Sequence, residues 1–183
     1  MSDWASWITG SVQNVWGILN ICVRGPVNTF AAQWPDFMQQ NLDPKAVAKA
    51  RGALLSSKTP ERGIYQVFLL GLMYCLPWEG WEISIERRGG SGYTGIRLVS
   101  KETKSAVLIE VKSSEKEEDI ERDSLVALDQ MDRKNYRNRY GLFGIRFLRE
   151  YGIANYHLES CVNGRYMELD SQSQWVQKDD PAT

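Results

Sequence analysis

The 183-residue sequence lacks the features that define several common protein classes. Its three cysteines, Cys22, Cys75 and Cys161, are widely spaced and form no Cys-x-x-Cys pair, so neither a disulfide framework nor a zinc knuckle is expected. No apolar run reaches the about 18 residues that a membrane span needs. The start, Met1-Ser2-Asp3, shows no basic segment followed by an apolar one, so no signal peptide is predicted. These absences predict an intracellular protein, cytoplasmic or nuclear.

An excess of charge of one sign is also missing. The 22 basic and 23 acidic residues give a net charge of −1, whereas a non-specific nucleic-acid coat carries a strong basic excess. The sequence contains neither a Gly-x-x-x-x-Gly-Lys phosphate loop nor a nucleophile elbow, which excludes the common NTPase and serine hydrolase motifs. The single histidine, His157, has no partner motif nearby and is interpreted as structural.

Residues 1–41 are predicted to form an N-terminal helical extension. Apolar residues recur at helical spacing from Trp4 to Val23, and Gly25-Pro26 is a stop signal. Trp34-Pro35 is expected to break the chain again. The apolar face of the first helix predicts packing on the core or on a second copy of the chain, which leaves a homodimer open. Its polar face lacks Lys and Arg, which argues against a membrane surface.

Residues 42–170 are predicted to form the main domain, followed by a polar tail, 171–183, that is expected to fray. The domain begins with two helices, continues with three strands and a long charged helix, and ends with further strands. The predicted helices are Asp43–Leu55, Thr59 to Pro77 and Ser113 to Tyr136, and the predicted strands are Trp81–Glu86, Tyr93–Val99, Ala106–Lys112, Leu142–Phe147, Ile153–Leu158 and an edge at Tyr166–Leu169. This order predicts a mixed sheet with helices on both faces.

The third predicted strand ends in an acid and a base two residues apart. Because side chains alternate along a strand, Glu110 and Lys112 share one face, while Ile109 and Val111 point into the core. A carboxylate beside an ammonium on a rigid strand end is suited to holding a divalent cation and orienting an attacking water. Taken alone, the same pair is also common where a strand runs out into solvent.

Five segments, taken in their order along the chain, indicate how the Glu110–Lys112 pair should be interpreted. They are Tyr65–Leu72, Gly89–Tyr93, Ile109–Lys112, Ala127–Met131 with Lys134–Tyr136, and Tyr140–Ile145. In this order and at these spacings they resemble the PD-(D/E)XK nuclease superfamily, nearest to the nuclease-like domain that accompanies AAA-ATPase-like modules in bacterial proteins. The resemblance implies an α/β fold with a restriction-endonuclease-like mixed central sheet flanked by helices.

The resemblance also implies a site and a function, namely metal-dependent hydrolysis of DNA with Mg²⁺ or Mn²⁺. Glu110 and the carbonyl of Val111 would bind the cation, Lys112 would steady the nucleophile, and Gln130 would help to position the phosphate. Glu61 on the first helix of the matched region is the candidate for completing the metal shell. The alternative for Glu61 is an acid that simply favours the helix N-terminus.

One position departs from the family pattern. The metal-binding Asp of the second strand is expected immediately before Ile96, where this sequence has Gly95. Glycine offers no ligand, so Gly95 marks a β-bulge, a degenerate site or an introduced substitution that inactivates the site. Two functions therefore stay open: a metal-dependent nuclease, inactive if the missing carboxylate is essential, and a non-catalytic nuclease-fold module that binds nucleic acid or a protein partner.

Several side chains near these motifs are candidates for contact with the DNA backbone. The main candidates are Arg87, Arg88, Lys134 and Tyr136, with Arg133, Arg137 and Arg139 in addition. For the basic residues near the end of the long helix, the alternative is a solvated helix C-terminus, where cations are favoured.

Overall fold

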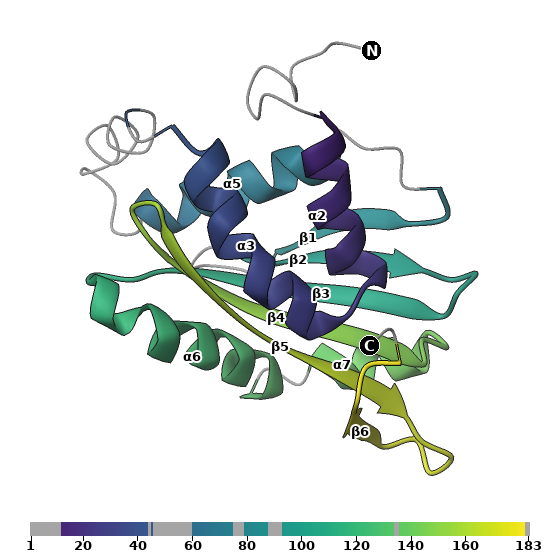
Figure 1. The fold of residues 1–183 in the computed structure, drawn as a ribbon. Coiled ribbons are helices and arrows are strands. Elements are labelled where there is room, and N and C mark those ends of the chain that lie inside the picture. The colour runs from purple at the N-terminus through teal and green to yellow at the C-terminus, as the bar shows by residue number, and fades with distance from the viewer. Residues whose placement is uncertain are drawn as a thin grey trace.

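Six strands form one sheet in the order in which they follow each other along the chain (Figure 1). The computed structural model describes residues 12–43, 45, 60–74, 79–87, 93–133 and 136–181. The strands are β1 (Glu82–Arg87), β2 (Tyr93–Ser100), β3 (Ser105–Ser113), β4 (Phe147–Tyr156), β5 (Glu159–Leu169) and β6 (Trp175–Lys178). All neighbours are antiparallel except β3 and β4, which are parallel because a helical crossover separates them. The sheet is mixed, as predicted.

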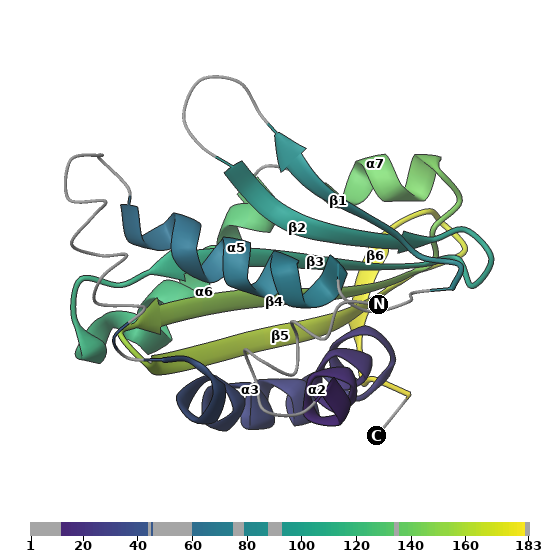
Figure 2. The same ribbon diagram turned by 90° about the horizontal axis from the view of Figure 1, so that it is seen from above.

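Helices cover both faces of the sheet, which confirms the predicted α/β architecture (Figures 1 and 2). One face carries α2 (Val12–Arg24), α3 (Val27–Asn41) and α5 (Pro60–Tyr74), and their buried side chains share one core with those of the strands. The opposite face carries α6 (Ile120–Arg133) and α7 (Tyr136–Leu142), preceded by the short helix η1 (Glu117–Asp119).

The N-terminal helices are part of the main hydrophobic core. Val15, Leu19, Cys22, Phe30 and Trp34 are buried in the cluster that also holds the strand residues of this face. This confirms the interpretation of the first helix as one that packs on the core. Its described apolar face is therefore used within the chain, and the structure gives no support for a homodimer through it. The first helix was predicted to begin near Trp4, but residues 1–11 lie outside the part of the chain that the structure describes.

Pro35 does not break the chain, contrary to the prediction, because α3 continues through it to Asn41. An internal proline removes one helical hydrogen bond and costs about 3 kcal/mol. Here the helix is held by aromatic packing on both sides of the proline: the ring centroids of Trp34 lie 5.4 Å from those of Phe30 and 5.5 Å from those of Phe37. The stop at Gly25-Pro26 is confirmed, since α2 ends at Arg24.

The segment after α6 differs most from its prediction. The long helix ends at Arg133 rather than Tyr136, and a separate helix, α7, runs through Leu142, where a strand was predicted. Gly144, with a φ of 77°, then turns the chain, and β4 begins only at Phe147. Leu142 is 87% exposed and Phe143 69% exposed, so the apolar run in this segment does not mark a buried strand.

The later strands are longer than predicted. The predicted strand Ile153–Leu158 contains the end of β4 and a turn at His157, whose φ is 52°. Strand β5 begins at Glu159 and includes the predicted edge piece at Tyr166–Leu169. The strands predicted in the first half of the sheet are confirmed, whereas the helix predicted at Asp43–Leu55 lies almost entirely outside the described residues.

The C-terminal tail is ordered by specific contacts, so the prediction that it frays was wrong for its described part. It contributes β6 and then the buried Asp180. Arg149 of β4 donates to Asp180 from Nη2 at 3.0 Å and from Nε at 3.2 Å, and the backbone N–H of Val27 donates to the same carboxylate at 3.1 Å. Asp180 thereby links the start of α3 to the sheet.

Among the described residues, no helix is both long enough and apolar enough to span a membrane.

Candidate functional site

Glu110 lies on β3, with a neighbouring strand on each side. The alternation predicted from the sequence is confirmed: Val107, Ile109 and Val111 belong to the core under α2, α3 and α5, whereas Leu108 packs under α6. Glu110 and Lys112 follow Leu108 at two-residue steps and share its face. Glu110 is 0% exposed and Lys112 is half-buried. A fully buried carboxylate is rare unless it is paired, which makes its contacts informative.

Gln130 of α6 holds the side chain of Glu110 in position. Its side-chain amide Nε2 donates a hydrogen bond to Oε1 of Glu110 at 2.8 Å. The two residues are therefore brought together, as the resemblance implies. The amide fixes the carboxylate inside the protein, since the donor comes from a helix that is itself packed on the sheet.

Gly152 explains how α6 comes so close to β3. It is the β4 residue in register with Glu110, and a Cβ atom at this position would overlap the carbonyl oxygen of Ser124 and lie 2.9 Å from the backbone nitrogen of Leu128. A side chain at this point would lift α6 off the sheet and separate Gln130 from Glu110. Gly152 was not predicted to belong to the site, although a glycine inside a strand signals a close backbone approach.

Gly95 lies on the other side of the carboxylate, at a β-bulge in β2. Ile85 pairs with Ile96 and Glu86 with Thr94, which leaves Gly95 as the extra residue. Its φ is 71°, and a Cβ atom here would lie 3.1 Å from the Ile109 carbonyl oxygen and 3.3 Å from Glu110 Oε2. The bulge, one of the alternatives predicted for Gly95, is thus present, and a side chain at this position would start beside the carboxylate of Glu110.

Comparison with known protein families identifies the family to which this fold and this site belong. A model of the PD-(D/E)XK nuclease superfamily matches residues 61–162, which is more than half of the chain. The chain belongs to the PD-(D/E)XK nuclease superfamily. Searches among curated proteins and among solved structures find no match. The matched region begins in α5 and ends in β5, so it contains every segment that carries the predicted site.

Of the metal site implied by PD-(D/E)XK membership, the described side chains supply one carboxylate, that of Glu110, whereas the side chain of Glu61 lies outside the described part. Nucleases of this superfamily generally use divalent metal ions, and Mg²⁺ takes about six oxygen ligands and keeps several waters. Glu110 is fully buried, and Gly95, where a Cβ atom would lie 3.3 Å from Glu110 Oε2, supplies no second carboxylate. The described residues also contain no group of three or more His, Cys, Asp or Glu side chains placed to hold a metal ion.

The other predicted ligands and DNA contacts stay predictions. The backbone of Glu61 belongs to the first turn of α5, that of Arg87 ends β1, and that of Tyr136 begins α7, but their side chains lie outside the described part. Arg88 and Lys134 lie outside it altogether. His157 sits in the β4–β5 turn, where its backbone carbonyl accepts a hydrogen bond from the Tyr65 hydroxyl at 2.8 Å.

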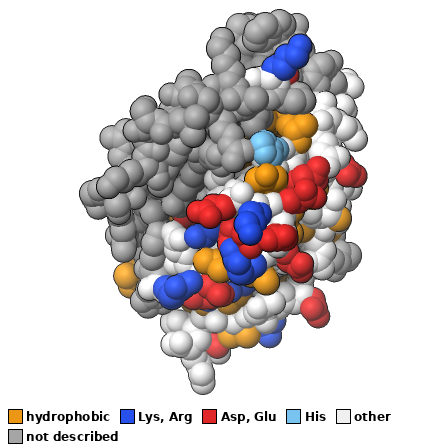
Figure 3. Space-filling view, turned by 90° about the vertical axis from the view of Figure 1, so that its left-hand side faces the viewer, with side chains coloured by type: hydrophobic (Ala, Val, Ile, Leu, Met, Phe, Trp, Pro, Cys, Tyr) orange, Lys and Arg blue, Asp and Glu red, His pale blue; other side chains and the backbone are white. Residues whose placement is uncertain are grey.

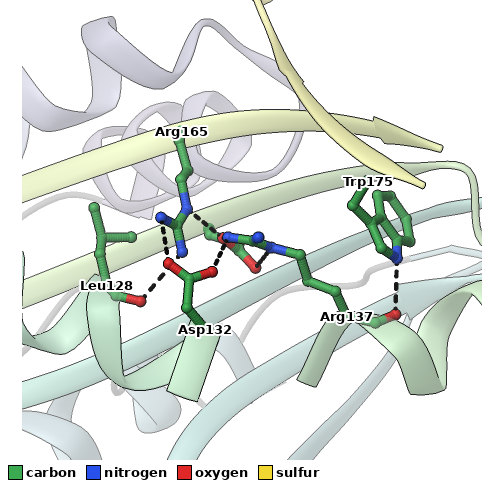
Figure 4. Close-up of polar contacts among 6 residues, drawn as sticks. Leu128, Asp132, Arg137, Arg165 and Trp175 are labelled. Carbon is green, nitrogen blue, oxygen red and sulfur yellow. Dashed lines mark hydrogen bonds and ion pairs between the residues drawn. The ribbon is translucent and has the colours of Figure 1, made fainter. Parts of the chain in front are cut away.

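Arg137, considered above as a DNA contact, belongs to an internal ion-pair network (Figure 4). Its Nε and Nη2 donate to the fully buried Glu150 at 2.8 and 2.7 Å, and Arg165 donates to the same carboxylate at 2.5 Å. Asp132 bridges the two arginines at 2.6 and 2.9 Å. Burial by itself lowers the pKa of Arg137, but the hydrogen bonds and charges of Glu150 and Asp132 outweigh burial, so the pKa is raised. Arg137 therefore holds α7 to the sheet.

The surface at the start of α6 carries charges of both signs (Figure 3). Arg122 pairs with Asp119 at 2.9 Å, and Lys116 pairs with Glu118 at 3.3 Å. All of these side chains except Asp119 are largely exposed, so each pair contributes little to stability. Within the described residues, this surface does not show the basic excess that attracts DNA without sequence preference.

Proposed function

We propose that this chain is a DNA-binding domain with a nuclease fold and an incomplete metal site, which does not hydrolyse DNA efficiently. Membership of a nuclease superfamily supports nucleic acid as the ligand. The observation that carries the loss of hydrolysis is the bulge at Gly95, a residue that points no carboxylate at Glu110 although a Cβ atom there would lie 3.3 Å from Glu110 Oε2.

Hydrolysis of a phosphodiester requires a cation that polarises the phosphate and activates water. Glu110 is instead buried and accepts a hydrogen bond from Gln130, so in this arrangement it joins α6 to β3. Restoring a carboxylate at position 95 also meets a steric obstacle, because a side chain there must tolerate a φ of 71° and two close oxygen atoms.

The alternative is a metal-dependent nuclease that uses Mg²⁺ or Mn²⁺ with Glu110, the Val111 carbonyl and Glu61, and with Lys112 at the nucleophile. The shared face of Glu110 and Lys112 and the contact of Glu110 with Gln130 favour this reading of the site. The two functions differ in one measurable property, which is divalent-dependent cleavage.

The test combines binding and cleavage with the full chain. Fluorescence anisotropy with a labelled duplex should show binding that weakens as salt rises. Supercoiled plasmid should remain intact with either Mg²⁺ or Mn²⁺. Nicking that requires Mn²⁺ and disappears in Lys112→Ala would overturn the proposal in favour of the nuclease. Absence of DNA binding at low salt would overturn it in favour of a different ligand.

A second arm uses Gly95→Asp, with Gly95→Asn as a control of the same shape but without charge. We expect no nicking from either variant, because the bulge prevents a productive carboxylate position. A gain of Mn²⁺-dependent nicking in Gly95→Asp alone would show a site that lacks only one ligand, and would contradict this expectation.

A further inference from the structure

A cleft of about 200 Å³ lies between the β1–β2 hairpin and the segment that ends α7. Tyr140 of α7 and Arg97 of β2 both line it. The cleft has apolar and aromatic walls with charged groups, and the residues that line it are Glu82, Arg97, Val99, Lys101, Tyr140, Phe143 and Ile145. None of these residues belongs to the site described above.

The cleft lies on the face of the sheet that also carries Glu110. Arg97 of β2 is in register with Leu108 of β3, whose side chain packs under α6. Gly95 and Glu110 lie two residues further along these same strands, a distance of roughly 7 Å.

Two side chains that line the cleft, those of Arg97 and Phe143, are suited to binding a ligand. Arg97 donates from Nε to Ser84 Oγ at 2.8 Å, which fixes its guanidinium group, and within the described residues it forms no ion pair with a carboxylate. Phe143 also lines the cleft and is 69% exposed, so its ring is accessible to a ligand. An exposed aromatic ring and a held guanidinium lining one cleft are the groups with which proteins stack a base and contact its phosphate.

We propose that this cleft binds one unpaired nucleotide, with its base against Phe143 and its phosphate at Arg97. A base inside a duplex is already stacked on its neighbours and is not free to reach the ring. The domain therefore prefers DNA with a single-stranded tail over a blunt duplex. This inference rests on the proposed DNA binding and specifies the class of DNA.

The test compares a blunt duplex with the same duplex carrying a short single-stranded tail. The full chain should bind the tailed DNA roughly tenfold more tightly. Phe143→Ala should abolish this preference without weakening binding of the blunt duplex, while Phe143→Trp should retain it. Arg97→Gln should weaken binding of the tailed DNA and lower the salt dependence by about one phosphate contact.

Leu142→Ala is the matched control, because Leu142 is the adjacent exposed apolar residue but has no ring. It should leave the preference unchanged. A 2-aminopurine base in the tail should lose fluorescence on binding to the wild type and not to Phe143→Ala, which reports stacking directly.

The outcomes separate this inference from the proposed function. Equal affinity for the two DNAs, or a preference that Phe143→Ala leaves intact, would overturn the cleft assignment while DNA binding stands. Equal losses in Leu142→Ala and Phe143→Ala would also overturn it, in favour of a general apolar contact such as a protein partner makes. Failure to bind either DNA would overturn both proposals.

Discussion

Gln130 and Glu110 form a hydrogen bond of 2.8 Å that joins α6 to β3. Because Glu110 is fully buried, removing the amide leaves its carboxyl group with one hydrogen bond fewer and without access to solvent. We expect Gln130→Ala to lower the free energy of unfolding by about 1–3 kcal/mol, measured by urea denaturation. The neighbouring Asp129→Ala, at an exposed position, should change it by less than about 0.5 kcal/mol. Equal effects of the two variants would show that the hydrogen bond is not important for stability.

Gly95 should be intolerant of a side chain for reasons of backbone conformation. A residue with a Cβ atom in the left-handed region costs about 1–2 kcal/mol, and here the atom would also crowd the Ile109 carbonyl at 3.1 Å. Gly95→Ala is therefore expected to lower the free energy of unfolding by at least about 1 kcal/mol. Gly17→Ala is the matched control, since a Cβ atom there meets nothing within 4 Å and the substitution in a helix should stabilise by about 0.5–1 kcal/mol. A neutral Gly95→Ala would contradict the strained bulge.

Local patterns predicted the half of the fold that carries the site. The alternation in Ala106–Lys112 and the segment order placed Glu110 and Lys112 on one face of the central sheet, and the structure has them there. Gly95 was predicted to be a bulge or a lost ligand, and the structure shows the bulge. These features could be predicted because they depend on the periodicity and spacing of neighbouring residues.

The features of the fold that could not be predicted depend on contacts between segments that are distant in the sequence. From the sequence, Pro35 predicts a helix break. The packing of Trp34 against Phe30 and Phe37, which allows the helix to continue, is visible only in the structure. Arg137 reads as a solvated cation at a helix end, and only its contact with Glu150 shows that it is internal. The role of Gly152 likewise requires knowing that α6 crosses β4 at that point. Sequence spacing carries no information about such pairs.

The assignment of Arg137 to the interior makes a prediction that separates it from a DNA contact. Arg137→Ala removes two hydrogen bonds to the buried carboxylate of Glu150 and should lower the free energy of unfolding by about 1.5–3 kcal/mol. The salt dependence of DNA binding should stay unchanged, because no phosphate contact is lost. Arg133→Ala, at an exposed position one helix earlier, should leave stability unchanged. A smaller salt slope with unchanged stability in Arg137→Ala would instead identify a phosphate contact.

The link between the tail and the sheet predicts a large effect from a residue three positions before the C-terminus. Asp180→Ala leaves the buried guanidinium of Arg149 without its carboxylate and the N–H of Val27 without its acceptor, which should cost about 3–5 kcal/mol. Urea denaturation measures the loss. Asp179→Ala, at the adjacent exposed position, should have little effect. Similar stabilities of the two variants would show that the tail is dispensable for the fold.

Alkaline pH should weaken the fold through buried tyrosines near this link. Burial, followed by the charge and hydrogen bond of Glu168, raises the pKa of Tyr166 to about 12, and burial also raises that of Tyr151 well above its usual value. The unfolded chain releases these protons near pH 10, so between about pH 10 and 12 the folded state holds more protons and stability falls as pH rises. Tyr166→Phe should reduce this fall by up to about 2 kcal/mol, measured by urea denaturation at pH 9 to 12. Identical slopes for the variant and the wild type would exclude Tyr166 as a source of the alkaline sensitivity, and a difference already present below pH 9 would indicate lost packing rather than titration.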